Sequence, residues 1–446
     1  MLRPLHSLLV LPLLWAGTAL AQTAPASSIN KAKLDSLLTI LDTNHKLAGS
    51  LQLTQNGQVV YSRAIGPEQA GVPATTATHY RIGSISKTFT ATMVMQLVEE
   101  GKLKLNAPIA TWFPTLPNAA TITVDHLLHH RSGLFDFTHD PAYVQYMTQP
   151  KTQAELLAII SAQPVEFAPG AKYAYNNSNY VVLSYLVEKL TKQPYAQALQ
   201  KRIADKLGLK DTYYGSRIDS KKHEAASFMW DGATWQVQRE TDMSIPSGAG
   251  AITSTPADLT RFIEGLYAGK LVKPATLQLM QTLQDGYGKG LSLIPFGSKQ
   301  GFGHFGSIDG YRSALTYFPA DKLTIAYCGN GVASGYSVND LVIGALAIYF
   351  NKPYPLPDFS GPTLTAAELS GFVGEYASSQ MPLKISIMAA QNTLVAQATG
   401  QSPFPLTAKS KTTFVYSTAG ITMEFDAVAH TFMLHQGANH FLFTRQ

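Results

Sequence analysis

The spacing of hydrophobic residues predicts a helix, a hairpin and a second helix near the start of the chain. Hydrophobic residues recur at helical spacing over residues 31–41, whereas residues 48–64 form two strand-like runs joined at Asn56-Gly57, a strong hairpin signal. An apolar run from Thr88 to Val98 then predicts a mostly buried helix. This order favours an antiparallel sheet flanked by helices, and therefore a mixed α/β (α+β) fold.

The pattern changes character after a proline-rich stretch that begins at Asn351. Residues 351–360 are predicted to be a stiff linker, followed by a short helix over residues 366–370. The remaining sequence alternates in short runs, which predicts an antiparallel sheet closing into a small barrel or sandwich. The predicted strands are 383–388, 393–398, 412–417, 421–426, 431–435 and 441–445.

The first residues resemble an export signal rather than part of a fold. Arg3 precedes an apolar run from Leu8 to Trp15, and Ala19-Leu-Ala21 then provides a cleavage site. The apolar run is too short for a bilayer, which needs about 20 residues. We therefore predict a signal peptide over residues 1–21 and a periplasmic or secreted protein without a transmembrane segment. The first predicted domain is 22–350, and the predicted C-terminal β domain is 361–446.

Composition narrows the class of protein further. The 446 residues are 45% hydrophobic and 14% charged, which is the profile of a folded globular protein and not of a disordered chain. The net charge of +5 comes from scattered lysines without a basic run, so a nucleic-acid partner is not expected. The single cysteine, Cys328, lies in a strand-like run and is expected to be a small buried side chain rather than a nucleophile.

Candidate catalytic residues cluster at the start of the predicted buried helix. Gly83 permits a sharp turn, and Ser84 and Lys87 follow at S-x-x-K spacing, which puts a hydroxyl and an amine on one helix face. The positive helix end and the apolar surroundings should lower the pKa of Lys87, so that it can act as a base. The motif recurs at Ser28, but in a polar segment without a buried helix behind it.

Two later segments carry further candidates. Tyr175 and Asn177 follow a Pro-Gly turn and precede a predicted helix over residues 181–190, where they face a cleft or, alternatively, Asn177 or Ser178 caps that helix. His304 begins a His-Phe-Gly-Ser segment that enters a strand. A strand edge there could present His304 to the cleft and offer a backbone amide as an oxyanion donor.

A metal site is the alternative interpretation of a histidine-rich segment. His126, His129 and His130 fall at helical spacing, but no H-E-x-x-H or carboxylate pattern accompanies them. We therefore expect no metal and no other cofactor.

Taken in order, Ser84-x-x-Lys87, Tyr175-x-Asn177 and His304-x-Gly306 resemble the class C β-lactamase-related serine hydrolases, the CubicO peptidase group with its penicillin-binding-protein-like members. The resemblance covers residues 30–350 and implies the serine β-lactamase/DD-peptidase-like fold with a helical subdomain. The segment 369–376 resembles the entry to the lipocalin-like C-terminal domains of this family.

The resemblance also implies roles for the residues. Ser84 is the expected nucleophile, Lys87 its proton acceptor and Tyr175 the proton relay to the leaving group, while Asn177 binds a substrate carbonyl. His304, Gly306 and Ser307 line the substrate site, and the backbone amides of Ser84 and Ser307 form the oxyanion hole. His130 has a scaffolding role in such proteins.

Two departures from the family pattern bear on the substrate. His304 stands where most class C β-lactamases have a lysine and is expected to be only partly charged near neutral pH. Phe305 replaces a threonine and cannot bind a carboxylate. We therefore predict an exported acyl-enzyme hydrolase of esters, amides or small D-amino-acid peptides, with weak β-lactam turnover.

Other functions stay open at this stage. A DD-carboxypeptidase acting on cell-wall peptide is one, and a catalytically idle cell-wall or lipid sensor is another. The C-terminal domain could gate the cleft, bind a lipid, mediate assembly or only stabilise the protein, because a small barrel can be filled by its own side chains. The sequence does not fix the oligomeric state.

Overall fold

The computed structural model describes residues 29–333, 336–390, 393–401, 403–416, 419–437 and 439–446. The predicted signal peptide over residues 1–21, the second S-x-x-K serine at Ser28, and Ser417 lie outside these ranges. Among the described helices, none combines the length and the hydropathy that crossing a bilayer requires.

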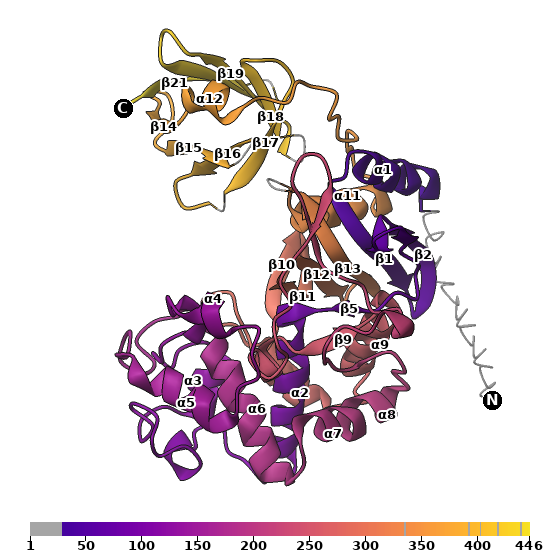
Figure 1. Cartoon of the computed structure of the whole chain (residues 1–446), viewed down its shortest axis with the longest axis vertical. Helices are drawn as coiled ribbons and strands as arrows, with labels where there is room; N and C mark the ends of the chain where they lie inside the picture. The colour runs from indigo at the N-terminus through magenta and orange to yellow at the C-terminus, as the bar shows by residue number, and fades with distance from the viewer. Residues whose placement is uncertain (1–28, 334–335, 391–392, 402, 417–418, 438) are drawn as a thin grey trace, which may run out of the picture.

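An antiparallel sheet forms the centre of the first domain (Figure 1). Its main path runs in the order β10-β11-β12-β13-β1-β2, with β7 added parallel to β13 and β8 paired to β7. The predicted hairpin is confirmed, since Asn56 and Gly57 both have positive φ, 51° and 76°, as a two-residue turn of this kind requires. The strands are β1 (Leu47–Gln55), β2 (Gln58–Ile65), β7 (Phe228–Trp230), β8 (Trp235–Val237), β10 (Ser292–Phe296), β11 (Lys299–Ile308), β12 (Tyr311–Phe318) and β13 (Leu323–Ala333).

Helices cover both faces of this sheet, as predicted. One hydrophobic cluster holds α1 (Lys31–Thr43) and α11 (Val338–Tyr349) against the sheet. A larger cluster joins α2 (Ser86–Glu99) and α9 (Pro256–Tyr267) to the short helices between residues 124 and 207, called the helical region below. Figure 1 shows α2 between the sheet and that region, so its first turn lies where the two parts meet.

The helical region contains most of the remaining short elements. Its helices are α3 (Val124–Leu128), α4 (Tyr143–Tyr146), α5 (Gln153–Ala162), α6 (Asn177–Thr191), α7 (Tyr195–Leu199) and α8 (Asp205–Leu207), and α10 (Pro274–Gln281) lies beyond α9 in the chain. Small strands pair as β5 (Tyr80–Arg81)-β9 (Ile252–Ser254)-β6 (Tyr213–Tyr214) and as β3 (Pro67–Gln69)-β4 (Val72–Pro73). Single turns are η1 (Gly83–Ile85), η2 (Ile109–Thr111), η3 (Phe137–His139), the π-turn η4 (Gln200–Ala204), η5 (Ser220–Lys222) and η6 (Ser247–Ala249).

The C-terminal domain is a closed antiparallel barrel, and not a sandwich. A short helix, α12 (Ala366–Ser370), precedes it. Its strands are β14 (Gly374–Ala377), β15 (Lys384–Ala390), β16 (Thr393–Ala398), β17 (Phe404–Ala408), β18 (Thr413–Tyr416), β19 (Ile421–Asp426), β20 (Thr431–Gln436) and β21 (Asn439–Arg445). The sequence did not predict β14, which is very short, or β17, which contains Pro405 and so lacks one ladder donor.

Large side chains fill the barrel interior. Phe414, Phe425, Phe432 and Phe443 are buried there, and their rings pack edge-on, tilted or stacked against one another. This packing favours the filled-barrel alternative over lipid carriage.

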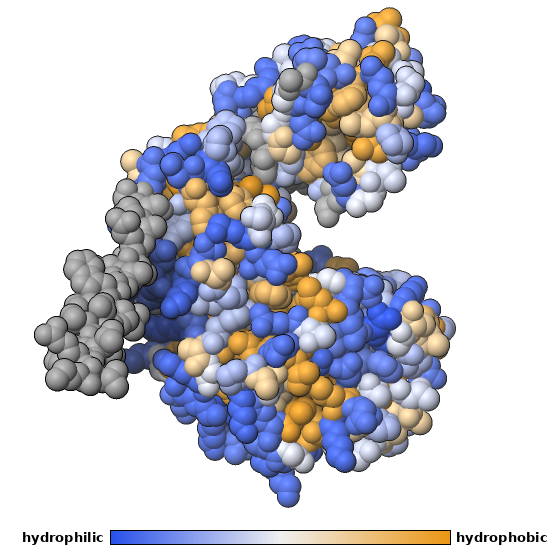
Figure 2. All heavy atoms as spheres, turned by 180° about the vertical axis from the view of Figure 1, so that it is seen from behind, coloured by the Kyte–Doolittle hydropathy of each residue, from blue (hydrophilic) through white to orange (hydrophobic). Residues whose placement is uncertain are grey.

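Among the described residues, contacts between the barrel and the first domain include one on α11. The Tyr416 hydroxyl donates to a carboxylate oxygen of Asp340 on α11 at 2.7 Å. Phe359, which lies in the predicted linker, packs against Tyr336 and under the ammonium group of Lys46. Figure 2 shows open space between the barrel and the helical region on the face that it displays.

Candidate active site

The first turn of α2 presents Ser84 and Lys87 to each other. Gly83 has φ +50°, a conformation that strains other residues, and it starts the turn η1 that carries Ser84. The Lys87 side chain is fully buried, and its Nζ lies 3.0 Å from Ser84 Oγ. The predicted hydroxyl–amine pair is therefore in hydrogen-bond contact.

The environment of Lys87 lowers its basicity. Its Nζ also donates to Asn177 Oδ1 and to the Ala249 carbonyl, both at 2.9 Å. Burial lowers the pKa of Lys87 to about 7, although the carboxylate of Asp136 opposes this shift. A substantial neutral fraction near pH 7 makes Lys87 suitable as a proton acceptor, as its position predicted.

Tyr175 forms one wall of the same site. Lys87 Nζ lies 4.8 Å from the centre of the Tyr175 ring, and the ring packs at 4.4 Å on the imidazole of His130. Desolvation raises the pKa of Tyr175, and a hydrogen bond with Ser84 partly opposes the shift. The residue is 37% exposed, so part of the ring still reaches solvent. The resting phenol is thus protonated and can donate.

Asn177 differs in one respect from the sequence prediction. It is the first residue of α6 rather than a loop residue before a helix starting at 181, because Asn176 caps the helix by accepting from Asn179 N. The capping alternative for Asn177 or Ser178 is therefore wrong. The Asn177 side chain is free of capping and directs Oδ1 to Lys87.

Asp136 is a buried site residue that sequence reasoning missed. One carboxylate oxygen accepts from the backbone N and the Nδ2 of Asn177, at 2.9 and 3.1 Å. The other accepts from the backbone N and the hydroxyl of Thr138. These contacts orient the Asn177 amide so that its oxygen accepts a hydrogen bond from Lys87.

Replacing Asp136 with asparagine is expected to lower kcat/KM about 10- to 100-fold, because the new amide cannot satisfy all four donors. Loss of the charge also removes what holds the pKa of Lys87 up, so the acid limb of the pH–rate profile should move to lower pH. Asp140→Asn, which changes a half-buried carboxylate on the same loop, is the control and should leave the limb in place. An unmoved limb in Asp136→Asn would contradict the assignment.

The end of β11 lies against the Ser84 turn. Its pairing with β10 ends at Gly303, which leaves residues 304–308 unpaired on that side. A Cβ at Gly306 would lie 2.0 Å from the Ile82 carbonyl, and one at Gly83 would lie 2.8 Å from Ser307 N. The backbones of Ser307 and the Ser84 turn are therefore in direct contact, which the predicted pair of oxyanion amides requires.

His304 is brought to the site, but its charge differs from expectation. It lies within β11 and is 5% exposed, with its ring 6.1 Å from that of Tyr175. Burial, aided by the positive charge of Lys87, lowers the pKa of His304 to about 3. His304 is thus neutral at pH 7, and not partly charged as its unperturbed pKa suggested.

The other histidines have structural contacts. His126 takes part in the N-terminal cap of α3, His129 pairs with Asp125, and His130 accepts from Asn176 N. Across the described ranges, no group of at least three His, Cys, Asp or Glu residues has a metal-binding arrangement. Cys328 is buried, and burial raises the pKa of its thiol.

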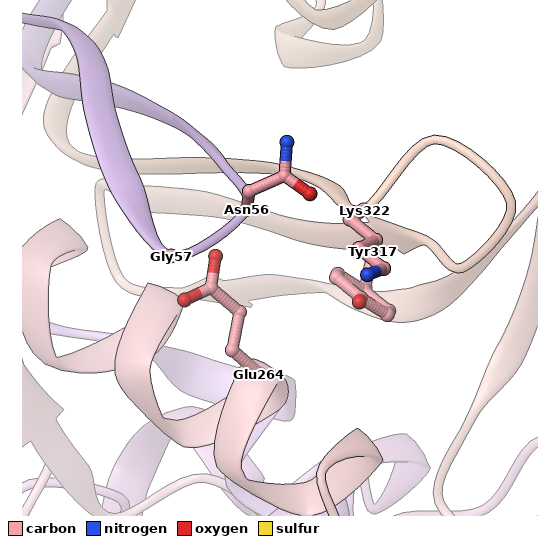
Figure 3. Close-up of a pocket in the computed structure, with 5 residues that line it drawn as sticks. All are labelled: Asn56, Gly57, Glu264, Tyr317 and Lys322. Carbon is pink, nitrogen blue, oxygen red and sulfur yellow. The ribbon is translucent and has the colours of Figure 1, made fainter. Parts of the chain in front are cut away.

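A separate small pocket lies at the far end of the sheet (Figure 3). Asn56 and Gly57 of the first hairpin, Glu264 of α9, and Tyr317 and Lys322 line it. None of the predicted site residues is among them. Because the Glu264 carboxylate accepts from the hydroxyls of Thr54 and Thr324, we interpret this carboxylate as structural.

The chain is similar over most of its length to known proteins. The family model described as Beta-lactamase matches residues 34–348. The teichoic acid D-alanine hydrolase of Staphylococcus aureus is 26% identical over 319 residues, which are 69% of this chain and 76% of that protein.

Solved structures extend the likeness to three dimensions. D-amino acid amidase from Ochrobactrum anthropi SV3, complexed with L-phenylalanine, aligns with a TM-score of 0.63 and 28% identity, covering 72% of this chain and 98% of that one. The octameric penicillin-binding protein homologue from Pyrococcus abyssi aligns with a TM-score of 0.67 over 93% of this chain and 100% of its own. Because the identity to this homologue is only 24%, the comparison shows a shared fold and nothing more. The alignment covers enough of the chain to include the barrel.

Proposed function

Because the chain belongs to the Beta-lactamase family and is a serine hydrolase, we propose that it cleaves amides, esters or small peptides of D-amino acids through an acyl-enzyme on Ser84. The observation that carries the proposal is the 3.0 Å contact between Ser84 Oγ and an amine whose pKa is lowered to about 7. That pair can generate a nucleophile at neutral pH.

Acylation follows from the residues in contact. Ser84 Oγ attacks the substrate carbonyl while its proton passes to neutral Lys87. The carbonyl oxygen takes up the charge between the amides of Ser84 and Ser307, each worth about 3 kcal/mol in comparable oxyanion holes. Tyr175 then gives its proton to the leaving nitrogen or oxygen and regains one from Lys87.

Deacylation uses the same groups with water in place of the leaving group. Water loses a proton to the Lys87–Tyr175 pair and attacks the ester, and Ser84 recovers its proton as the acid departs. Since the two groups interact closely, their titration belongs to the pair. The proposed role of Asn177, binding a substrate carbonyl, requires Nδ2 as the donor, and this group must then turn from Asp136 Oδ2 and Thr138 Oγ1, to which it donates in the structure.

The substrate class is inferred from charge and from the relatives. Neither a neutral His304 nor the aromatic Phe305 supplies a cation for a substrate carboxylate, which disfavours β-lactams and peptides ending in D-Ala-D-Ala. A teichoic acid D-alanine hydrolase and a D-amino acid amidase among the relatives support D-aminoacyl substrates. DD-carboxypeptidase activity is the second candidate.

Purified protein is expected to hydrolyse D-phenylalanine amide or a D-alanyl ester at least about tenfold faster, by kcat/KM, than a D-Ala-D-Ala peptide or benzylpenicillin. The expectation rests on the missing charge-assisted contact to a carboxylate. Paired L-amide substrates serve as the control for stereochemistry. Efficient penicillin hydrolysis, or none of these activities, would contradict the proposal, and the latter would favour an idle sensor.

The proposal includes export and domain roles. The leader-like residues 1–21 favour a periplasmic or secreted enzyme with residues 22–350 as the hydrolase unit. Residues 351–360 would then serve as a linker to a barrel at 361–446 whose filled interior suits a stabilising role.

A further inference from the structure

Tyr287 is a buried residue next to His304 that has no role in the mechanism above. It is 3% exposed, and its hydroxyl lies 3.1 Å from His304 Nε2. Its ring also packs on His130, at 4.7 Å, and on Tyr175, at 6.3 Å. Tyr287 therefore contacts the back of the site from an element that is separate from α2, α6 and β11.

A tight turn places Tyr287. Asp285 and Gly286 have φ of 52° and 82°, and backbone hydrogen bonds in both directions between Gln284 and Tyr287 close the turn. An Asp-Gly pair is the sequence signal for such a turn.

The same loop is fixed at several points. Arg131 pairs with Asp285, and buried Lys289 pairs with Asp125 at 3.2 Å. Thr88 of α2 donates to the Gly290 carbonyl at 2.7 Å. Tyr287 thus approaches His304 from a loop anchored both to α2 and to the helical region.

The hydrogen bonds of His304 determine its tautomer. Nδ1 lies 2.5 Å from the Phe305 carbonyl oxygen, which can only accept, so Nδ1 carries the proton. Buried near Lys87, the ring is neutral, and Nε2 is therefore a bare acceptor. In this contact the Tyr287 hydroxyl is the donor, because Nε2 has no proton to give. The Tyr180 hydroxyl, which donates to the Leu128 carbonyl, is a second acceptor beside the Tyr287 hydroxyl.

We propose that Tyr287 is a specificity-determining positioning residue, whose hydroxyl occupies Nε2 of the neutral Nδ1–H imidazole of His304 and so keeps this nitrogen from binding a substrate carboxylate. Both ring nitrogens are occupied, and the substrate meets an uncharged imidazole. This inference rests on the proposed function, because it explains why uncharged amides and esters are favoured over carboxylate-bearing substrates.

The groups that face His304 determine how readily its ring takes a proton when the Tyr287 hydroxyl is removed. Lys87 on α2 opposes protonation of the ring, whereas Tyr175 and Tyr287 are neutral phenols and His130 is a buried neutral imidazole. Removal of the Tyr287 hydroxyl takes away a donor that stabilises the neutral ring, so Nε2 becomes easier to protonate, although burial and the charge of Lys87 still oppose this protonation. The freed imidazole then offers a donor to a substrate carboxylate, most strongly at acidic pH.

The first test needs no substrate. Imidazole ¹⁵N spectra of the full-length protein labelled at histidine, with His304 assigned by its loss in His304→Gln, should show the Nδ1–H tautomer at pH 7. An Nε2–H tautomer or a charged ring in the wild type would overturn the proposal. This readout stands even if hydrolysis of D-amino-acid amides is not found, so the two proposals can fail separately.

The second test uses Tyr287→Phe, which keeps the ring. The ratio of kcat/KM for a D-Ala-D-Ala peptide to that for a D-amino-acid amide should rise at least about fivefold at pH 5.5, with a changed His304 ¹⁵N signal. Tyr173→Phe, whose ring lies 6.1 Å from Tyr287, is the matched control and should change neither. An unchanged ratio and tautomer in Tyr287→Phe would overturn the assignment.

Discussion

Replacing Ser84 with alanine is expected to lower kcat/KM for a D-aminoacyl ester or amide at least about 10⁴-fold, because the remaining groups bind and polarise the substrate without a nucleophile. Ser84 is half-buried on η1 and is not a member of the hydrophobic core clusters, so the thermal unfolding temperature should stay close to that of the wild type. Steady-state hydrolysis and differential scanning calorimetry check the two expectations.

Ser86 provides the matched control. It is two residues away, fully buried, and its hydroxyl accepts from Ile252 N, so it supports packing rather than the site. Ser86→Ala should cost some stability and keep kcat/KM within about tenfold of the wild type. Equal losses of activity in the two variants, or residual activity above a hundredth in Ser84→Ala, would contradict the assignment of the nucleophile.

The second large effect concerns Lys87. Since its pKa is lowered to about 7 and the neutral amine is the acceptor, kcat/KM should fall about tenfold per pH unit below pH 7 and level off above it. Lys87→Met, which keeps the length of the side chain, should lower kcat/KM about 10³-fold and remove this acid limb. The measurement is the pH–rate profile of each protein.

Lys172→Met is the control for the lysine prediction, because Lys172 is exposed and packs over Phe167 outside the catalytic contacts. It should leave the profile unchanged. Activity that stays flat from pH 5 to 7 in the wild type would mean that Lys87 is not the resting base.

Local signals explain why the sequence predicted the centre of the site. Ser84 and Lys87 meet because the rise and rotation of one helical turn bring residues three apart together, and Asn56-Gly57 encodes its own turn. The burial of Lys87 also followed from the apolar run around it. Such features depend on neighbours within a few residues.

Partners distant in the chain explain what was missed. Asp136 holds Asn177 across 41 positions, and no pattern around the aspartate signals this contact. Desolvation by the surrounding fold, and not the sequence near His304, sets its charge. The start of α6 was predicted too late because polar residues fill its first turn, although the caps that favour such a start were visible at Asn176.

Tyr287 illustrates a signal that was present and unused. The Asp285-Gly286 pair predicts a tight turn, which the structure contains. The contact of Tyr287 with His304, however, also depends on the packing of this loop against α2 at Gly290, which a local pattern does not show. For β17 the local signal was misleading. Pro405 disfavours a strand, but β17 forms because it closes the barrel between its neighbours.

Labelling of the protein with a fluorophosphonate, followed by peptide mapping, tests whether Ser84 is the nucleophile. The peptide Ile82–Lys87 contains both Ser84 and Ser86, so fragmentation must locate the adduct. We expect one adduct per chain, on Ser84 alone, that forms more slowly below pH 7. An adduct on another residue, or substrate hydrolysis by a protein that stays unlabelled, would contradict it.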